Sequence, residues 1–168
     1  EIVKKYKNVM VLAEQDKLIH DNKENIEVIH LGVDETQFKR TNKLPNNKTL
    51  VFSGNMSYTP NVDAVIWFLE TCWDYIISTV PDAKFKIVGA NPSTMLDKYR
   101  SMSNVEITGK VDSMVEALNT VQIAIAPLRS SSGMQNKILE AMACGLPVIS
   151  TSLGLGNIEA QNGKDVFV

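Results

Sequence analysis

Short runs of β-forming residues alternate with helical patterns along most of this chain, and this alternation constrains the fold more than any other feature. The β-rich runs occupy residues 9–13, 26–31, 50–54, 84–89, 105–108, 121–127 and 147–151. Parallel strands need a long crossover between them, usually a helix, and helices then cover the sheet. From Leu50 onward, strand and helix alternate without interruption, which predicts an α/β fold with a doubly wound, Rossmann-like parallel sheet.

The clearest helical pattern lies between the strands at 50–54 and 84–89. Over residues 61–79 the apolar side chains recur three or four positions apart: Val62, Val65, Ile66, Leu69, Trp73, Ile76 and Ile77. This spacing predicts an amphipathic helix with one face on the core. Shorter helices are expected over 93–102, 113–119 and 134–144, and the last of these is followed by Gly145 and Pro147, which typically end a helix.

A polar stretch over residues 36–48 interrupts the pattern and contains Pro45. We interpret it as a linker, and an ordinary long surface loop is the alternative. On the linker interpretation, residues 1–41 are the remnant of an N-terminal domain with the interdomain linker. Residues 42–168 then form a nucleotide-binding C-terminal domain that is truncated at its C-terminal end. The chain opens without Met and stops in a strand-like run, so we expect both ends to be cut.

Composition argues against several classes of partner. The 17 basic and 19 acidic residues are scattered along the chain and give a net charge of -2, so we expect no nucleic-acid partner. Cys72 and Cys144 lie far apart, without a CxxC pair or a Cys/His pattern, so we expect no metal site and a cytoplasmic location. The apolar runs are too short to span a bilayer, and peripheral membrane association of the full-length protein stays open.

The chemistry is expected where ligands bind in open parallel sheets, outside the carboxyl ends of the strands. Turns follow three of these ends, at Ser53-Gly54-Asn55, at Gly89-Ala90-Asn91 and over 127–133. The third turn contains small residues and leads into the helix expected from Met134. Unpaired N–H groups and the positive end of the helix dipole make such a helix start suitable for an anion.

Two charged residues on this last helix define a candidate binding site. Lys137 falls in its first turn and would add a positive charge for a diphosphate, and Glu140 lies one turn further and could accept hydrogen bonds from two ribose hydroxyls. Spacing alone leaves another interpretation open, an i,i+3 ion pair on the surface of a helix whose apolar residues serve the core.

The run GMQNKILEAMACGLPVIST resembles the signature helix and strand of the retaining glycosyltransferases with the GT-B fold, known as family 4 or group 1. Further segments resemble the same family in the same order: NIEVIHLGVDETQF, VFSGNMSYTPNVDAVIWF, FKIVGANP, VEITGKVDS and IAIAPLRSSSG. The resemblance covers nearly the whole chain. It implies that this chain is the donor-binding half of a GT-B fold, with the acceptor held by an N-terminal domain and with no required metal or cofactor.

The resemblance also implies roles for individual residues. The family pattern has two Glu residues separated by seven other residues. Glu140 matches the second of these and would bind the ribose. The backbone around Lys110 and Val111 would lie along the edge of the nucleotide base. Contacts to the diphosphate and the sugar are expected from the turn after the first strand and from the segment before the last helix: Gly54, Asn55, Ser131, Ser132, Gly133, Met134, Gln135 and Asn136.

Two departures from the family pattern affect these roles. Ser132 stands where many relatives have the first Glu, which contacts the transferred sugar. Many relatives also have an Arg and a Lys after the glycine of the first strand, where this chain reads GNMSYTPN. Lys137 is the candidate replacement for that charge, and Arg129 is a second candidate, with a solvated loop residue as its alternative.

The resulting hypothesis is transfer of a sugar, with retention, from a nucleoside diphosphate donor to a glycan or lipid-linked acceptor in polysaccharide biosynthesis. We expect this fragment to bind the donor without catalysing transfer. A sugar-nucleotide 2-epimerase of the same fold remains an alternative, as does a non-enzymatic doubly wound module that binds another protein.

Overall fold

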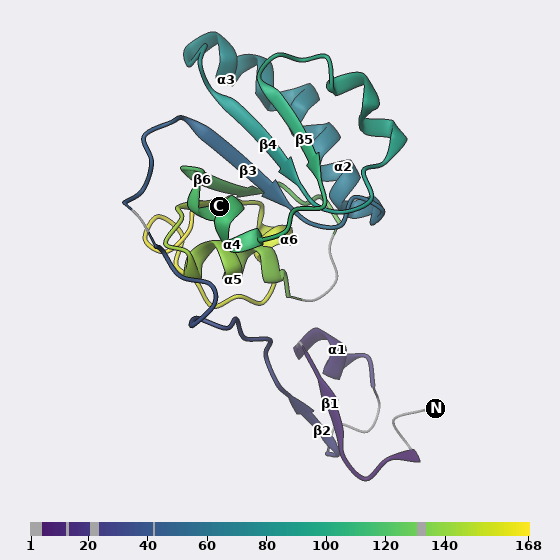
Figure 1. The fold of residues 1–168 in the computed structure, drawn as a ribbon. Coiled ribbons are helices and arrows are strands. Elements are labelled where there is room, and N and C mark those ends of the chain that lie inside the picture. Colours follow the sequence, from purple (N-terminus) through teal and green to yellow (C-terminus); the bar gives the residue numbers. More distant parts are fainter. Residues whose placement is uncertain (1–4, 13, 21–23, 42, 131–133) are drawn as a thin grey trace.

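Five parallel strands form the central sheet of the computed structural model, which describes residues 5–12, 14–20, 24–41, 43–130 and 134–168 (Figure 1). The strands are β3 (Thr49–Ser53), β4 (Lys84–Val88), β5 (Val105–Gly109), β6 (Ile123–Ala126) and β7 (Val148–Ser150). Their spatial order is β5-β4-β3-β6-β7. The chain therefore runs from β3 to β4 and β5 on one side of β3, and then returns to add β6 and β7 on the other side. This order confirms the predicted doubly wound sheet.

Alternation along the strands divides the apolar residues between two faces. Phe52 and Ile125 pack into one buried cluster, whereas their neighbours Val51 and Ala124 pack into the other. The first cluster is covered by α2 (Thr59–Phe68) and the short 3₁₀ helix η3 (Thr94–Tyr99). The second is covered by α4 (Met114–Asn119) and α5 (Asn136–Ala143). Both faces of the sheet are thus buried, as an all-parallel sheet requires.

The helix predicted over 61–79 forms, but it changes its winding in the middle. After α2 a π-helical turn, η2 (Leu69–Trp73), leads into α3 (Asp74–Thr79). Trp73 is fully buried, with its ring centroid 6.3 Å from that of Phe68 and 5.7 Å from that of Phe85. The wider turn coincides with the place where this large ring enters the core.

The other helices differ from prediction mainly at their ends. The expected helix at 93–102 is the shorter η3, whose start is capped by the Ser93 hydroxyl, which accepts a hydrogen bond from the Met95 amide at 3.3 Å. The helix predicted at 134–144 is α5, which begins later than predicted, at Asn136. A further short helix, α6 (Ser152–Leu155), follows β7.

The described residues before 29 form a small separate unit, which lies apart from the sheet in Figure 1. It consists of β1 (Val9–Val11), α1 (Glu14–Leu18) and β2 (Ile26–Val28), with β1 and β2 paired in parallel. An extended segment joins this unit to β3, and Asn119 at the end of α4 holds it. The Asn119 side chain accepts from the Thr41 amide at 3.0 Å and donates to the Lys39 carbonyl at 3.1 Å. The segment predicted as a linker is therefore fastened to the sheet domain.

Two other features bear on the sequence expectations. Cys72 and Cys144 are both free thiols, and burial raises the pKa of Cys144. Within the described ranges, no helix combines the length and the apolar character that a membrane crossing needs.

Candidate functional site

The carboxyl ends of β3 and β4 and the start of α5 enclose a pocket of about 490 Å³, which we call the β3–β4 pocket. It is lined by Ser53, Gly54, Asn55, Tyr58, Asn61, Gly89, Ala90, Met114, Gln135, Asn136, Lys137 and Glu140. The pocket thus brings together two of the turns that the sequence placed at strand ends and the first turns of the last predicted helix. This is the crevice in which open parallel sheets bind ligands.

Glycines allow the two strand-end turns to approach each other. A Cβ atom on Gly89 would lie 1.7 Å from the carbonyl oxygen of Gly54, so any side chain at this position would clash with that backbone. A Cβ atom on Gly54 would lie 2.7 Å from the Asn61 amide nitrogen and 3.1 Å from the Lys137 ammonium nitrogen. The turns therefore need glycine for close packing, and the ammonium of Lys137 lies directly over the backbone of Gly54.

Lys137, in the first turn of α5, supplies the positive charge of the pocket. Its ammonium donates a hydrogen bond to Asn61 Oδ1 at 2.5 Å and lies 4.2 Å from the centroid of the Phe52 ring. Burial lowers the pKa of Lys137 to about 7, and the nearby Glu140 carboxylate opposes part of this shift. A pKa near neutrality distinguishes Lys137 from an exposed lysine, whose charge is fixed at this pH.

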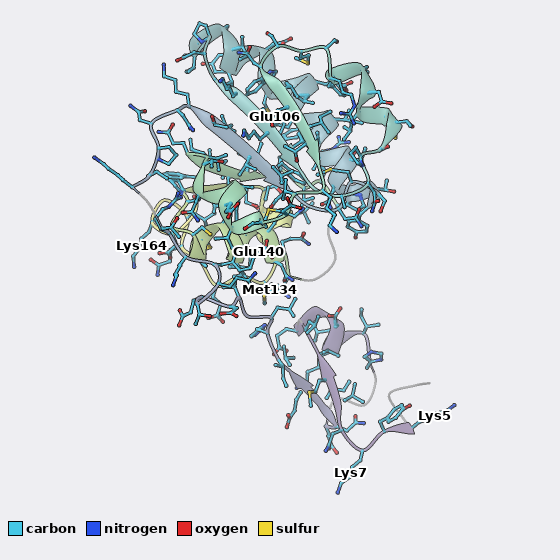
Figure 2. The ribbon with its side chains drawn as sticks, viewed as in Figure 1. Lys5, Lys7, Glu106, Met134, Glu140 and Lys164 are labelled. Atoms are coloured by element: carbon cyan, nitrogen blue, oxygen red, sulfur yellow. The ribbon has the colours of Figure 1, made fainter. Side chains whose placement is uncertain are left out.

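Figure 2 shows Glu140, which lies one turn further along α5. Its side chain lines the same pocket as Lys137. Its side chain is half-buried, and burial raises its pKa while the Lys137 ammonium lowers it. A carboxylate in this position can accept hydrogen bonds from two neighbouring hydroxyl groups. Lys137 and Glu140 therefore share a concave pocket, unlike the solvated surface pair that was their alternative.

Gln135 and Asn136 also line the pocket at the start of α5. The residue before the helix, Gln135, makes no capping hydrogen bond with its side chain. Among the residues that the structure describes, the helix start at Gln135 and Asn136 therefore carries no such cap, and a helix start is a place where N–H donors can meet an anion.

Other predicted site residues take up different places. The Asn55 side chain accepts hydrogen bonds from the Ser57 amide at 3.1 Å and from Asn91 Nδ2 at 3.3 Å, which shapes the turn at the pocket rim. Arg129 is bound by both carboxylate oxygens of Asp63 on α2, with the Nε to Oδ2 distance at 3.0 Å, and does not line the pocket. Its charge is matched within the protein, unlike that of Lys137.

The remaining predicted residues lie outside the pocket lining or outside the described residues. Lys110 is exposed, and Val111 packs against the core cluster beneath α4. Met134, which precedes α5, lines a smaller cavity of about 290 Å³ on another side of the helix. Ser131, Ser132 and Gly133 fall among the residues that the structure does not describe.

Sequence reasoning missed one buried polar residue of the pocket. Asn61 is only 5% exposed, and it holds both Lys137 and the carbonyl of Asn55. An Asn near a helix start usually indicates a cap. The helix instead begins after Tyr58, so Asn61 is its third residue and turns its amide inward.

Comparison with known proteins then identifies the family. Residues 47–168 match the family model described as "Glycosyl transferases group 1". The chain belongs to this family. A curated relative, an "Uncharacterized 44.6 kDa protein in cps region" of Klebsiella pneumoniae, is 24% identical over 131 residues, which are 73% of this chain and 34% of the relative.

Solved glycosyltransferases share the fold. TarM aligns with a TM-score of 0.79 at 21% identity, covering 98% of this chain and 33% of TarM. HepE of Anabaena, solved with UDP and glucose, gives a TM-score of 0.74 at 16% identity and covers 96% of this chain and 48% of HepE. The pneumococcal O-GlcNAc transferase GtfA, solved with UDP and GlcNAc, gives 0.73 at 13% identity and covers 95% and 33%. These matches confirm the Rossmann-like half of a GT-B fold.

The chain is much shorter than these relatives. It spans about a third of the Klebsiella protein and between a third and a half of the three structures. The glycosyltransferase family is therefore established for this chain, whereas the activity and substrates of the whole protein are inferred below.

Proposed function

We propose that this chain binds the sugar donor of a retaining glycosyltransferase, and that the β3–β4 pocket holds a nucleoside diphosphate sugar. The diphosphate lies between Gly54 and the start of α5, where the Lys137 ammonium meets it. The ribose hydroxyls donate to Glu140. A further part of the protein, beyond this chain, holds a glycan or lipid-linked acceptor.

One observation carries this proposal: a largely buried ammonium and a half-buried carboxylate lie one helical turn apart in a single pocket at the strand ends. A diphosphate next to a pentose presents an anion beside a pair of hydroxyl donors. The pocket offers the complementary groups in that order. It also compensates for the missing Arg and Lys after β3, because Lys137 reaches the backbone of Gly54 from α5.

The same groups would assist sugar transfer. As the bond between the sugar and the diphosphate breaks, negative charge grows on the leaving diphosphate. An ammonium and helix N–H groups already in place stabilise that charge more in the transition state than in the ground state. Acceptor alignment and exclusion of water need the further part of the protein, so this chain by itself binds the donor but does not turn it over.

Two comparisons support the class of substrates. HepE and GtfA were solved with UDP together with glucose or GlcNAc, and both share the fold of this chain. The Klebsiella relative is named for a "cps region". We take UDP-glucose as the first donor to test and a glycan as the acceptor class.

Isothermal titration of this chain with UDP, GDP and ADP tests the proposal. At least one diphosphate should bind, and Lys137→Met and Glu140→Gln should each weaken that binding about tenfold or more, since charge-assisted hydrogen bonds are lost. Lys164→Met, which removes an exposed lysine outside the pocket, should leave it unchanged. A chain that ignores all three nucleotides would be a protein-interaction module and would contradict the proposal.

A product assay on the longer protein separates transfer from the isomerase alternative. We expect a new glycosidic product when donor and acceptor are both present. Conversion of the donor into its 2-epimer without an acceptor would show instead that the protein is a sugar-nucleotide epimerase.

A further inference from the structure

Asn61 is oriented by hydrogen bonds at both ends of its amide. Its Nδ2 donates to the Asn55 carbonyl oxygen at 2.9 Å, and its Oδ1 accepts from the Lys137 ammonium at 2.5 Å. A carbonyl accepts only and an ammonium donates only, so the amide fits in a single orientation. Because Asn61 is buried in the first turn of α2, this arrangement ties α5 to α2 across the pocket.

The surroundings of Lys137 hold it without cancelling its charge. From α2 it meets the neutral amide of Asn61, and from β3 it meets the face of the Phe52 ring. The titratable neighbours in the pocket are Glu140 on its own helix and Tyr58 in the turn before α2. Among the described residues, the charge that acts on Lys137 is that of Glu140, and it acts through space. The group in direct contact with the ammonium is therefore a polar one that carries no charge.

We propose that Asn61 is a positioning residue for Lys137. It holds the ammonium over the backbone of Gly54 and leaves the positive charge unneutralised for an incoming diphosphate. An aspartate in the same place would make the same hydrogen bond to the lysine, but it would pair with the charge and repel the ligand. The inference rests on the proposed donor function, and it names the residue that keeps the pocket cationic.

Proton uptake follows from this arrangement. Burial holds the pKa of Lys137 at about 7, so part of the free protein is uncharged at neutral pH. A bound anion favours the charged form, and binding then takes up a proton. Affinity should be constant well below the pKa and should fall by up to about tenfold per pH unit above it. The two phosphates of UDP-glucose stay fully ionised through this range, so they contribute no pH dependence of their own.

The experiment measures UDP-glucose binding between about pH 6 and pH 9 for the wild-type chain and for Asn61→Asp, Asn61→Ser and Lys137→Met. We expect the wild type to lose affinity above neutral pH. Lys137→Met should bind weakly with no pH dependence. Asn61→Asp should also bind at least about tenfold more weakly, with the fall in affinity moved to higher pH, because a carboxylate raises the pKa of its lysine partner.

Asn61→Ser keeps the test decisive if Asn61→Asp does not fold, because a small neutral residue releases the lysine without pairing with it. We expect weaker binding and a shifted pH midpoint. Asp63→Asn, the reverse change two residues along α2, is the matched control and should leave affinity within about twofold. Wild-type affinity for Asn61→Asp, or a pH profile that neither variant moves, would overturn the inference. If the wild-type chain binds no diphosphate at any pH, the donor function itself fails.

Discussion

Two basic side chains reach the start of α2, and they meet opposite kinds of partner there. Arg129, which follows β6, is bound by both carboxylate oxygens of Asp63. Lys137, in α5, donates a hydrogen bond to the amide oxygen of Asn61, which lies two residues before Asp63 on α2. The carboxylate raises the pKa of Arg129 and the guanidinium lowers that of Asp63, whereas burial lowers the pKa of Lys137 to about 7.

The comparison shows how one helix can pair one cation with a carboxylate at one position and hold another with a neutral amide at a second position. Arg129 is half-exposed and already paired with Asp63, so solvent screens its ion pair and the pair contributes little to stability. Lys137 is more deeply buried, and no carboxylate of the described residues forms an ion pair with it. A buried cation of that kind is costly for the fold, and such cost is common where a site binds an anion.

The largest expected difference between the two positions is in donor binding. Lys137→Met should weaken the binding of UDP-glucose by about 30-fold, within the range of a lost charge-assisted hydrogen bond. Arg129→Met should change the affinity for UDP-glucose by less than about twofold, because the Arg129 charge is already paired with Asp63. Isothermal titration of both variants at pH 6.5 measures this, and equal losses for the two would remove the distinction.

A smaller effect is expected one turn further along α5. Glu140→Gln should weaken UDP binding about tenfold, because an amide is a poorer acceptor for two hydroxyls than a carboxylate. The 2′-deoxy form of UDP provides the control, since it lacks one of the hydroxyls. We expect Glu140→Gln to affect this analogue less than UDP. The same loss for both ligands would place Glu140 away from the ribose.

The smallest expected effect is on stability, and its sign differs between the two basic residues. The folded pKa of Lys137 lies below its unfolded value of 10.5, so the charged lysine destabilises the fold at low pH and this penalty disappears as pH rises from about 7 to 10.5. Lys137→Met should therefore raise Tm by roughly 3–6 °C at pH 6.5, corresponding to about 1–2 kcal/mol. Arg129→Met should leave Tm unchanged or slightly lower. Differential scanning calorimetry at pH 6.5 and pH 9 would show the gain for Lys137→Met shrinking at the higher pH, and a constant gain would contradict the pKa shift.

The sheet could be predicted from the sequence because its signals are local. Alternating residues such as Val51 and Phe52 mark both faces of a buried strand, and the spacing from Val62 to Ile77 marks the helix between β3 and β4. The π-helical turn at Leu69–Trp73 was not predictable, because the spacing of its buried residues also fits an ordinary helix. The packing of Trp73 against Phe85 appears only in three dimensions.

The site was predicted in part. Lys137 and Glu140 share a helix, so their spacing already placed them on one face, and the structure adds the pocket around them. Two facts depended on residues more than 60 positions apart and could not be read from the chain. One is the pairing of Arg129 with Asp63, which removes Arg129 from the pocket. The other is the contact of Asn61 with Lys137, because an Asn near a helix start resembles a cap until the helix boundary is known.

A crystal structure of this chain soaked with UDP tests most directly whether the β3–β4 pocket binds the donor. We expect phosphate oxygens within about 3 Å of the Lys137 ammonium and of the N–H groups that begin α5, with the ribose hydroxyls on Glu140. Nucleotide bound at another place on the sheet, or a ribose turned away from α5, would contradict the account.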